Sequence, residues 1–193
     1  MSSRPRGRPR SFDPAQALAR AAERFRTRGF SGTSLDELSE ATGLNRPSLY
    51  AAFGDKRALY LAALRRRHDA QEARLAALAD AGPPLDEALA RLFALAIHGC
   101  LSGETGPAGC IAVATATAEA TADPAVRDAL AAQIAMEDRL LERLLAAAGA
   151  DDPPGQARLV VAVMQSLTVR ARAGATRDEL ERLARDCIRL VAG

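Results

Sequence analysis

The segment TSLDELSEATGLNRPSLYAAFGDK, residues 33–56, constrains the fold most strongly, because it contains two short helical patterns separated by one glycine. Ser34 and Glu37 match the capping box that begins a helix. Gly43 can end this helix, since glycine adopts the left-handed backbone conformation without a steric penalty. Asn45 is a favourable N-cap for a second helix. The segment therefore predicts two consecutive short helices joined by a tight turn.

The second of these helices combines an apolar inner side with a polar outer side. Leu49 and Phe53 are four residues apart, so they are expected to point toward the core. The side chains left to face outward are Arg46, Ser48, Tyr50 and Ala51. Two short helices with a polar second member are typical of a helix-turn-helix motif that binds DNA. We expect its first turn to contact base edges in the major groove, and Tyr50 to contact a phosphate.

Lys56 is the only lysine among the 26 basic residues of the chain. It begins the next helical pattern, directly after the favourable cap Asp55. The helix dipole disfavours a cation at a helix N-terminus, so the position requires another reason. We predict a contact with a DNA phosphate; the alternative is a lysine retained by chance on a solvated surface.

The charge of the chain is unevenly distributed. Residues 1–70 contain 14 basic and 7 acidic residues, whereas residues 71–193 contain 12 basic and 17 acidic ones. This asymmetry fits a DNA-binding module attached to a regulatory body. The sequence RPRGRPR alternates arginine with proline and glycine, so residues 1–12 are expected to form a flexible basic arm. Arg6 and Arg8 are expected to contact an AT-rich minor groove or phosphates; the alternative is a solubilising tail.

The segment from Ala17 to Leu64 resembles the DNA-binding domain of the TetR family of bacterial transcriptional regulators. The matching motifs are AAERFRTRGFSGTS, LDELSEATGL and NRPSLYAAFGDKRALY, and the later stretch SLTVRARAGATRDELERLAR also resembles the end of such regulators. The resemblance implies an all-α homodimer with a three-helix helix-turn-helix domain at residues 13–55. Residues 56–193 would form a helical effector-binding and dimerisation domain. The implied partners are double-stranded operator DNA and a small-molecule effector.

The resemblance also implies roles for residues of the motif. Residues matching Thr33, Tyr50 and Lys56 touch phosphates, and those matching positions 45–48 lie in the groove. Ala51 departs from the family pattern, in which a polar side chain is common here, and is a candidate for contact with a thymine methyl group. The full set of expected DNA-contacting residues is Arg6, Arg8, Thr33, Ser34, Asn45, Arg46, Pro47, Ser48, Tyr50, Ala51 and Lys56.

Helical periodicity and helix-breaking residues divide the rest of the chain. Asp13 and Pro14 begin a helix that should end at Gly29. No stretch shows the alternation of a strand, which predicts an all-α fold. Further helices are expected at residues 56–81, from 85 to the glycine-rich break at 99–109, and at 110–122, 124–148, 156–173 and 176–191.

The last two predicted helices have more apolar residues than one core-facing stripe requires. We expect the surplus to form a four-helix interface in a homodimer; the alternative is burial within one subunit. The residues expected at this interface are Leu159, Val163, Leu167, Leu180, Leu183 and Ile188.

The helices between residues 85 and 148 are expected to enclose a mostly aliphatic effector cavity, with plain core as the alternative. The expected lining is Phe93, Ile97, Cys100, Cys110 and Ile134. Some TetR-type regulators use a cysteine in a similar Gly-Cys setting to sense electrophiles or oxidants. A helix N-terminus at Cys110 would favour this chemistry; the alternative is a small buried apolar residue.

Other functional classes lack their sequence signatures. The cysteines at 100, 110 and 187 have neither disulfide nor zinc spacing, and no phosphate loop or nucleophile elbow occurs. We therefore expect no enzyme, no cofactor and no metal. No apolar run could span a bilayer and no signal peptide is present, which predicts a cytoplasmic protein. We predict a ligand-responsive repressor; a cysteine-based sensor and a non-specific architectural DNA binder stay open as alternatives.

Overall fold

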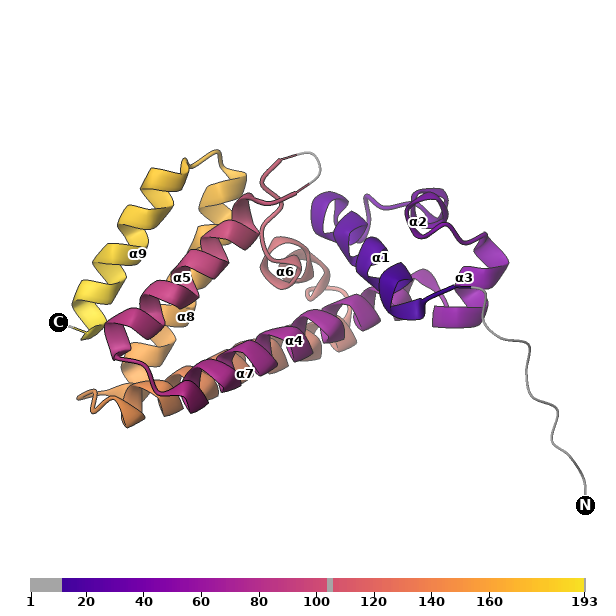
Figure 1. The fold of residues 1–193 in the computed structure, drawn as a ribbon. Coiled ribbons are helices and arrows are strands. Elements are labelled where there is room, and N and C mark those ends of the chain that lie inside the picture. Colours follow the sequence, from indigo (N-terminus) through magenta and orange to yellow (C-terminus); the bar gives the residue numbers. More distant parts are fainter. Residues whose placement is uncertain (1–11, 104–105, 193) are drawn as a thin grey trace, which may run out of the picture.

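The computed structural model describes residues 12–103 and 106–192, and all regular structure in these ranges is helical (Figure 1). The all-α prediction is therefore confirmed. The expected arm residues Arg6 and Arg8 lie outside the described residues. In chain order the elements are α1 (Pro14–Arg28), α2 (Leu35–Thr42), α3 (Arg46–Phe53), α4 (Lys56–Ala81), α5 (Leu85–Leu101), η1 (Ala112–Ala116), α6 (Thr117–Glu119), α7 (Pro124–Ala147), α8 (Pro153–Arg172) and α9 (Arg177–Ala192).

Local capping fixes where the second and third helices begin and end. Ser34 and Glu37 form a complete capping box at the start of α2. Gly43 ends that helix with φ 71° and ψ 16°, in the left-handed region that favours glycine. The Asn45 side chain accepts a hydrogen bond from the Ser48 N–H at 2.9 Å and so begins α3. These caps agree with the sequence prediction.

The first three helices and the start of α4 enclose a small core built around aromatic rings. Phe25 and Tyr60 are almost completely buried, and their ring centroids lie 5.1 Å apart in an edge arrangement. The ring centroid of Phe30 lies 5.2 Å from that of Tyr60. Leu38 and Leu49 complete the core from α2 and α3. Three short helices enclose little volume, so rings are an efficient filling.

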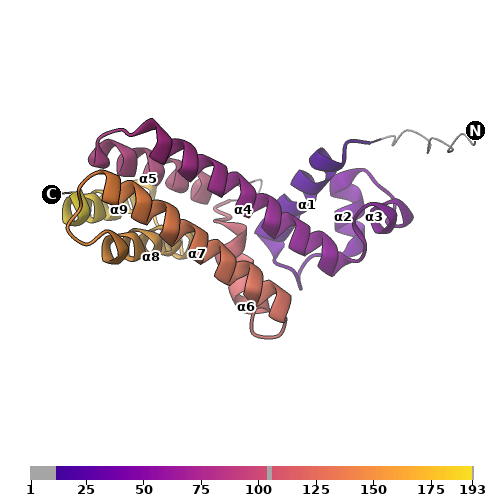
Figure 2. The same cartoon turned by 90° about the horizontal axis from the view of Figure 1, so that it is seen from below.

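The helix α4 joins the two parts of the molecule. Its beginning packs against α1, and α7 lies beside it along its length (Figures 1 and 2). Leu59 and Ala63 belong to the small core, whereas Leu75 belongs to the larger core of the helical body. One continuous helix therefore contributes to both cores.

The helical body consists mainly of α5, α7, α8 and α9, with α4 along one side (Figure 2). Its core contains fully buried side chains from four different helices, among them Leu89, Phe93, Leu141, Val160 and Leu180. Each helix thus contributes an apolar stripe to one shared interior, as expected of an amphipathic helix in a globular domain.

The segment after the glycine-rich break is helical within the predicted range of residues 110–122, but it is not one regular α-helix. It forms the π-helix η1, followed by the single turn α6. The hydroxyls of Thr115 and Thr117 donate to the carbonyls of Ile111 and Val113 at 2.8 and 3.0 Å. Threonine side chains that bond to carbonyls four residues back disturb the regular ladder of a helix. A helical segment is therefore present within the predicted range, and its first part is a π-helix.

Candidate nucleic-acid interface and effector cavity

The helix α3 lies at the end of the molecule remote from α8 and α9 (Figure 1). Leu49, which is 3% exposed, anchors its inner side in the small core together with the half-buried Phe53. Tyr50, which is 47% exposed, and the exposed Ala51 lie on the other side. The predicted division of α3 into an inner and an outer side is confirmed.

Arg46 forms an ion pair at the start of α3. Its Nη2 lies 2.7 Å from each carboxylate oxygen of Asp36 on α2, and its Nε lies 3.0 Å from one of them. The hydrogen bonds to Asp36 raise the pKa of Arg46 above its ordinary value. Both side chains are largely exposed, so water screens the pair and the guanidinium remains accessible. This pairing was not predicted from the sequence.

Thr33 is placed differently from the prediction. The residue is only 1% exposed. Its hydroxyl donates to the Gly29 carbonyl at 2.7 Å, and its N–H donates to the Phe30 carbonyl at 3.3 Å. Neither group is available to a phosphate, because the turn between α1 and α2 uses both. The neighbouring Ser34 is exposed, and its hydroxyl accepts the Glu37 N–H of the capping box.

Lys56 contacts the ring of Phe30 within the same subunit, which was not predicted from the sequence. Its Nζ lies 4.4 Å from the centroid of the Phe30 ring, within the range of a cation–π interaction. This contact gives the lysine a reason to occupy a helix N-terminus without any DNA. The phosphate contact of Lys56 stays a prediction.

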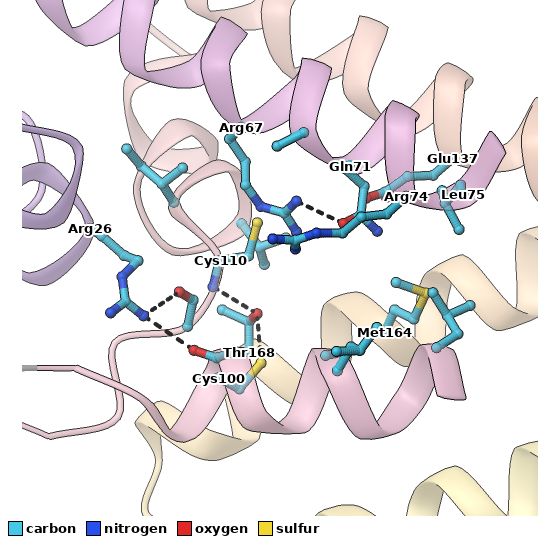
Figure 3. A pocket seen from close by; sticks show the side chains of 18 of the residues that line it. Arg26, Arg67, Gln71, Arg74, Leu75, Cys100, Cys110, Glu137, Met164 and Thr168 are labelled. Carbon is cyan, nitrogen blue, oxygen red and sulfur yellow. Dashed lines mark hydrogen bonds between the residues drawn. The ribbon is translucent and has the colours of Figure 1, made fainter. Parts of the chain in front are cut away.

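A cavity of about 640 Å³ lies between α1, α4, α5, η1 and α8 (Figure 3). Its volume is typical of small-molecule sites. Cys100 and Cys110 both line it, and Thr168 connects them. The Thr168 Oγ1 accepts the Cys110 N–H at 3.2 Å and lies 3.5 Å from the Cys100 Sγ. Burial raises the pKa of the Cys100 thiol.

Three residues that were expected in the lining lie elsewhere. Phe93 and Ile97 are 1% and 2% exposed and belong to the larger hydrophobic core. Ile134 is half-buried on α7 and does not line the cavity. The physical reason is that α5 presents only one side to the cavity. That side carries Leu92, Leu95, Ala96, Gly99 and Cys100.

Five arginines from α1, α4 and α5 line the cavity, and none of them was predicted from the sequence. Arg26 on α1 and Arg67 and Arg74 on α4 are shown in Figure 3, and the other two are Arg66 and Arg91. Positions 67 and 74, with Gln71 between them, have the helical spacing that places side chains on one face. This spacing was a usable signal, but the sequence did not show that this face borders a cavity.

Hydrogen bonds tie α1 directly to the cavity wall. The Arg26 Nη1 donates to the carbonyls of Gly99 and Gly109 at 3.2 Å each (Figure 3). The Tyr60 hydroxyl and the Thr115 Oγ1 lie 2.7 Å apart in a buried contact. Burial raises the pKa of Tyr60 to about 12. The cavity wall and the small core therefore share polar as well as apolar contacts.

Two further polar contacts link the same regions. The Arg57 Nη2 donates to an Asp123 carboxylate oxygen at 2.7 Å, and the Ser31 hydroxyl donates to Glu119 at 3.0 Å. The hydrogen bond from Arg57 lowers the pKa of Asp123 to about 2. The beginning of α4 is thus attached to the N-cap of α7, and the loop after α1 is attached to the end of α6.

The outer sides of α8 and α9 expose large apolar side chains. Leu159 is 43% exposed, Val169 62% and Leu190 77%. Two residues expected at a dimer interface are instead 0% exposed within one subunit, which corrects the prediction. They are Leu167 and Leu180. Both belong to the inner stripes of their helices, where the body of the same subunit covers them completely. The other expected residues, Val163, Leu183 and Ile188, are half-buried.

The described residues contain no group of three His, Cys, Asp or Glu side chains placed to hold a metal ion. In the same part of the chain no helix is both long and apolar enough to cross a membrane.

This geometry defines a class of protein, in which a three-helix domain with an exposed second motif helix is joined to a helical body that contains a cavity. Residues 17–63 match the family described as bacterial regulatory proteins, tetR family. Residues 84–193 match the tetracyclin repressor-like C-terminal domain. The chain belongs to the TetR family of transcriptional regulators.

Similar proteins include two transcriptional repressors of Escherichia coli K12. ComR is 33% identical over 199 residues, which cover 96% of this chain and 91% of ComR. BdcR is 31% identical, with 92% of this chain and 88% of BdcR covered. The solved structure of the regulator CifR in complex with a 26-bp operator has a TM-score of 0.82 at 32% identity, covering 94% of this chain and 98% of CifR. Reduced NemR from E. coli shares the fold, with a TM-score of 0.78 at 22% identity and 90% and 94% covered.

Proposed function

We propose that this regulator is a repressor that binds double-stranded operator DNA as a homodimer and is released by a small molecule bound in the cavity. The exposed outer side of α3 is the observation that carries the proposal. The similar proteins support it, because ComR and BdcR are transcriptional repressors and the CifR structure contains operator DNA.

In the proposed complex, the first turn of α3 faces base edges in the major groove. The Arg46 guanidinium is exposed, and its planar fork suits a guanine or a phosphate. Binding there replaces the contact with Asp36. Tyr50 contacts a phosphate. The other proposed contacts are Ser34, Asn45, Pro47, Ser48, Ala51 and Lys56.

The proposed dimer forms through the outer sides of α8 and α9. Leu159, Val169 and Leu190 expose apolar surface to water in the single subunit, and a second copy of the same surface would cover it. Two α3 helices placed one turn of DNA apart, about 34–36 Å, would then contact two half-sites of one operator.

The cavity is well placed to control DNA binding. Its lining includes Arg26 of α1 and Arg67 of α4, two helices that also form the small core beneath α3. A ligand that fits one arrangement of these helices better than another shifts the population toward that arrangement. We propose that this shift separates or rotates the two α3 helices and weakens operator binding.

A second candidate is a sensor in which an electrophile or oxidant modifies a cavity cysteine. It is favoured by the position of Cys110, which is half-buried, lines the cavity and shares Thr168 with Cys100. Among the similar structures, CifR carries substituted cysteines and NemR is in its reduced form. Treatment of the folded protein with N-ethylmaleimide, followed by mass spectrometry, tests this candidate. If Cys110 stays unlabelled, the cysteine-sensor hypothesis is excluded.

The proposed DNA surface can be tested by gel shift with the DNA that flanks the gene of the protein. Arg46→Ala should reduce the discrimination between bases at one or two base pairs. Lys56→Ala should weaken binding to all DNA sequences equally and lower the slope of log affinity against log salt concentration by about one. Arg143→Ala, an exposed change on α7, is the control. If Arg46→Ala and Lys56→Ala both behave like the wild type, the assigned surface is wrong. Low sequence preference of the wild type would indicate an architectural binder instead.

A further inference from the structure

The cavity has an excess of positive charge in an otherwise apolar wall. The charged residues of its lining are Arg26, Arg66, Arg67, Arg74, Arg91, Glu23 and Glu137. The rest of the described lining consists mainly of Ala, Leu, Ile, Val and Met, and it contains no aromatic ring. A ligand of this cavity would therefore find aliphatic surface and guanidinium groups rather than rings for stacking.

Two of these arginines are neutralised by neighbours in the sequence. Arg26 forms two hydrogen bonds to the Glu23 carboxylate, at 2.6 and 2.8 Å. Arg91 pairs with Glu87 one turn earlier on α5. Their charge is already balanced within the protein, so neither arginine needs a ligand.

The other three lining arginines, Arg66, Arg67 and Arg74, form no ion pair with any described residue; Arg66 and Arg74 are exposed and Arg67 is half-buried. Arg67 and Arg74 lie seven residues apart, which places them on one face of α4. Both extend from one face of α4 into the cavity (Figure 3). The Arg67 Nη1 donates to the Gln71 Oε1 at 2.7 Å, which is a neutral acceptor. Two guanidinium groups that extend into one cavity and have no carboxylate within ion-pair distance leave positive charge for an anion to neutralise, and their fork geometry suits a carboxylate.

Glu137 also lines the cavity but forms no ion pair with Arg67 or Arg74. It lies on α7 and is 6% exposed, and its Oε1 accepts a hydrogen bond from the Gln133 side chain at 2.7 Å. Burial raises the pKa of Glu137 above its ordinary value, and the charge of Arg67 acts in the opposite direction. Glu137 therefore offsets part of the positive charge of the cavity and not all of it.

We propose that the effector is an aliphatic molecule with a single carboxylate, which Arg67 and Arg74 bind together. The proposal rests on the proposed function in one respect, that the cavity is the effector site. The aliphatic chain packs against the apolar part of the lining, which includes Leu75, Leu78, Leu92 and Met164. A neutral chain of the same length loses the charged hydrogen bonds, and a cationic chain is repelled by the guanidinium groups.

Isothermal titration of the full chain without DNA tests the proposal, with decanoate, 1-decanol and decyltrimethylammonium as probes. Decanoate should bind at least about 10-fold more tightly than decanol, and the cation should bind least. The double variant Arg67→Met and Arg74→Met should lose the preference for decanoate while its affinity for decanol stays the same. Arg65→Met is the matched control, since Arg65 is exposed on the same helix and does not line the cavity.

Equal affinity of the wild type for decanoate and decanol would overturn the proposal without reference to any variant. A double variant that is folded by circular dichroism and still prefers decanoate would overturn it as well. A gel shift with decanoate tests the proposed function separately. If decanoate is preferred but the operator complex persists, the carboxylate site stands and the release mechanism is wrong.

Discussion

Replacing Arg26 with Met should loosen the connection between α1 and the cavity wall. The Arg26 guanidinium donates to the carbonyls of Gly99 and Gly109 at 3.2 Å each. The Gly99 carbonyl keeps the Ser102 hydroxyl as a donor at 3.1 Å. Gly109 is buried, and its carbonyl has no other donor among the described residues. An unsatisfied buried carbonyl costs about 1–3 kcal/mol, so we expect the free energy of unfolding to fall by about 2 kcal/mol.

Urea denaturation followed by far-UV circular dichroism measures this loss. Hydrogen–deuterium exchange should also become faster around Gly99 and Gly109, because both residues lose their contact with α1. Arg20→Met is the control, since Arg20 is exposed on the same helix. A loss below about 0.5 kcal/mol, or one that Arg20→Met reproduces, would show that the hydrogen bonds of Arg26 do not stabilise the fold.

Three other substitutions test the packing, the dimer and the acid stability. Leu180→Ala should lower the free energy of unfolding by about 2–5 kcal/mol in a urea titration, because Leu180 is 0% exposed within one subunit; a loss typical of a surface site would contradict the placement. Leu190→Ala should weaken self-association in sedimentation velocity, because Leu190 is 77% exposed on the proposed dimer surface; unchanged association would exclude that surface. The pKa of Asp123 is lowered from 3.8 to about 2, so this carboxylate stabilises the fold above its unfolded pKa and the effect is lost as the pH falls toward 2. Asp123→Asn should therefore reduce the loss of stability over that range in an acid titration, and an identical acid transition would speak against the ion pair with Arg57.

The helix boundaries around α2 and α3 are predictable from sequence because capping is local. Ser34 reaches Glu37 within one turn, and Asn45 reaches Ser48 within one turn. The ion pair between Arg46 and Asp36 is not predictable in this way. The two residues lie on different helices, and only the packing of α2 against α3 brings them together.

Periodicity predicts that a helix has an apolar face, but it does not say what each part of that face contacts. The surplus of apolar residues on the last two helices is real, since Leu159 and Leu190 remain exposed. Leu167 and Leu180 belong to the same apolar pattern as Leu159 and Leu190, yet they are buried in the core. Adjacent helical residues point in directions about 100° apart, so a small rotation of a helix decides between core, cavity and surface. For the same reason Phe93 was predicted to line the cavity, although it lies in the core.

Hydrogen–deuterium exchange with and without the flanking DNA shows whether the outer side of α3 is the DNA surface. Short exposed helices exchange through local opening, which a bound duplex would suppress. We expect new protection at residues 45–53 and none at the opposite end of the molecule, at the start of α8. Unchanged exchange in α3, with protection over α8 and α9 instead, would contradict this assignment.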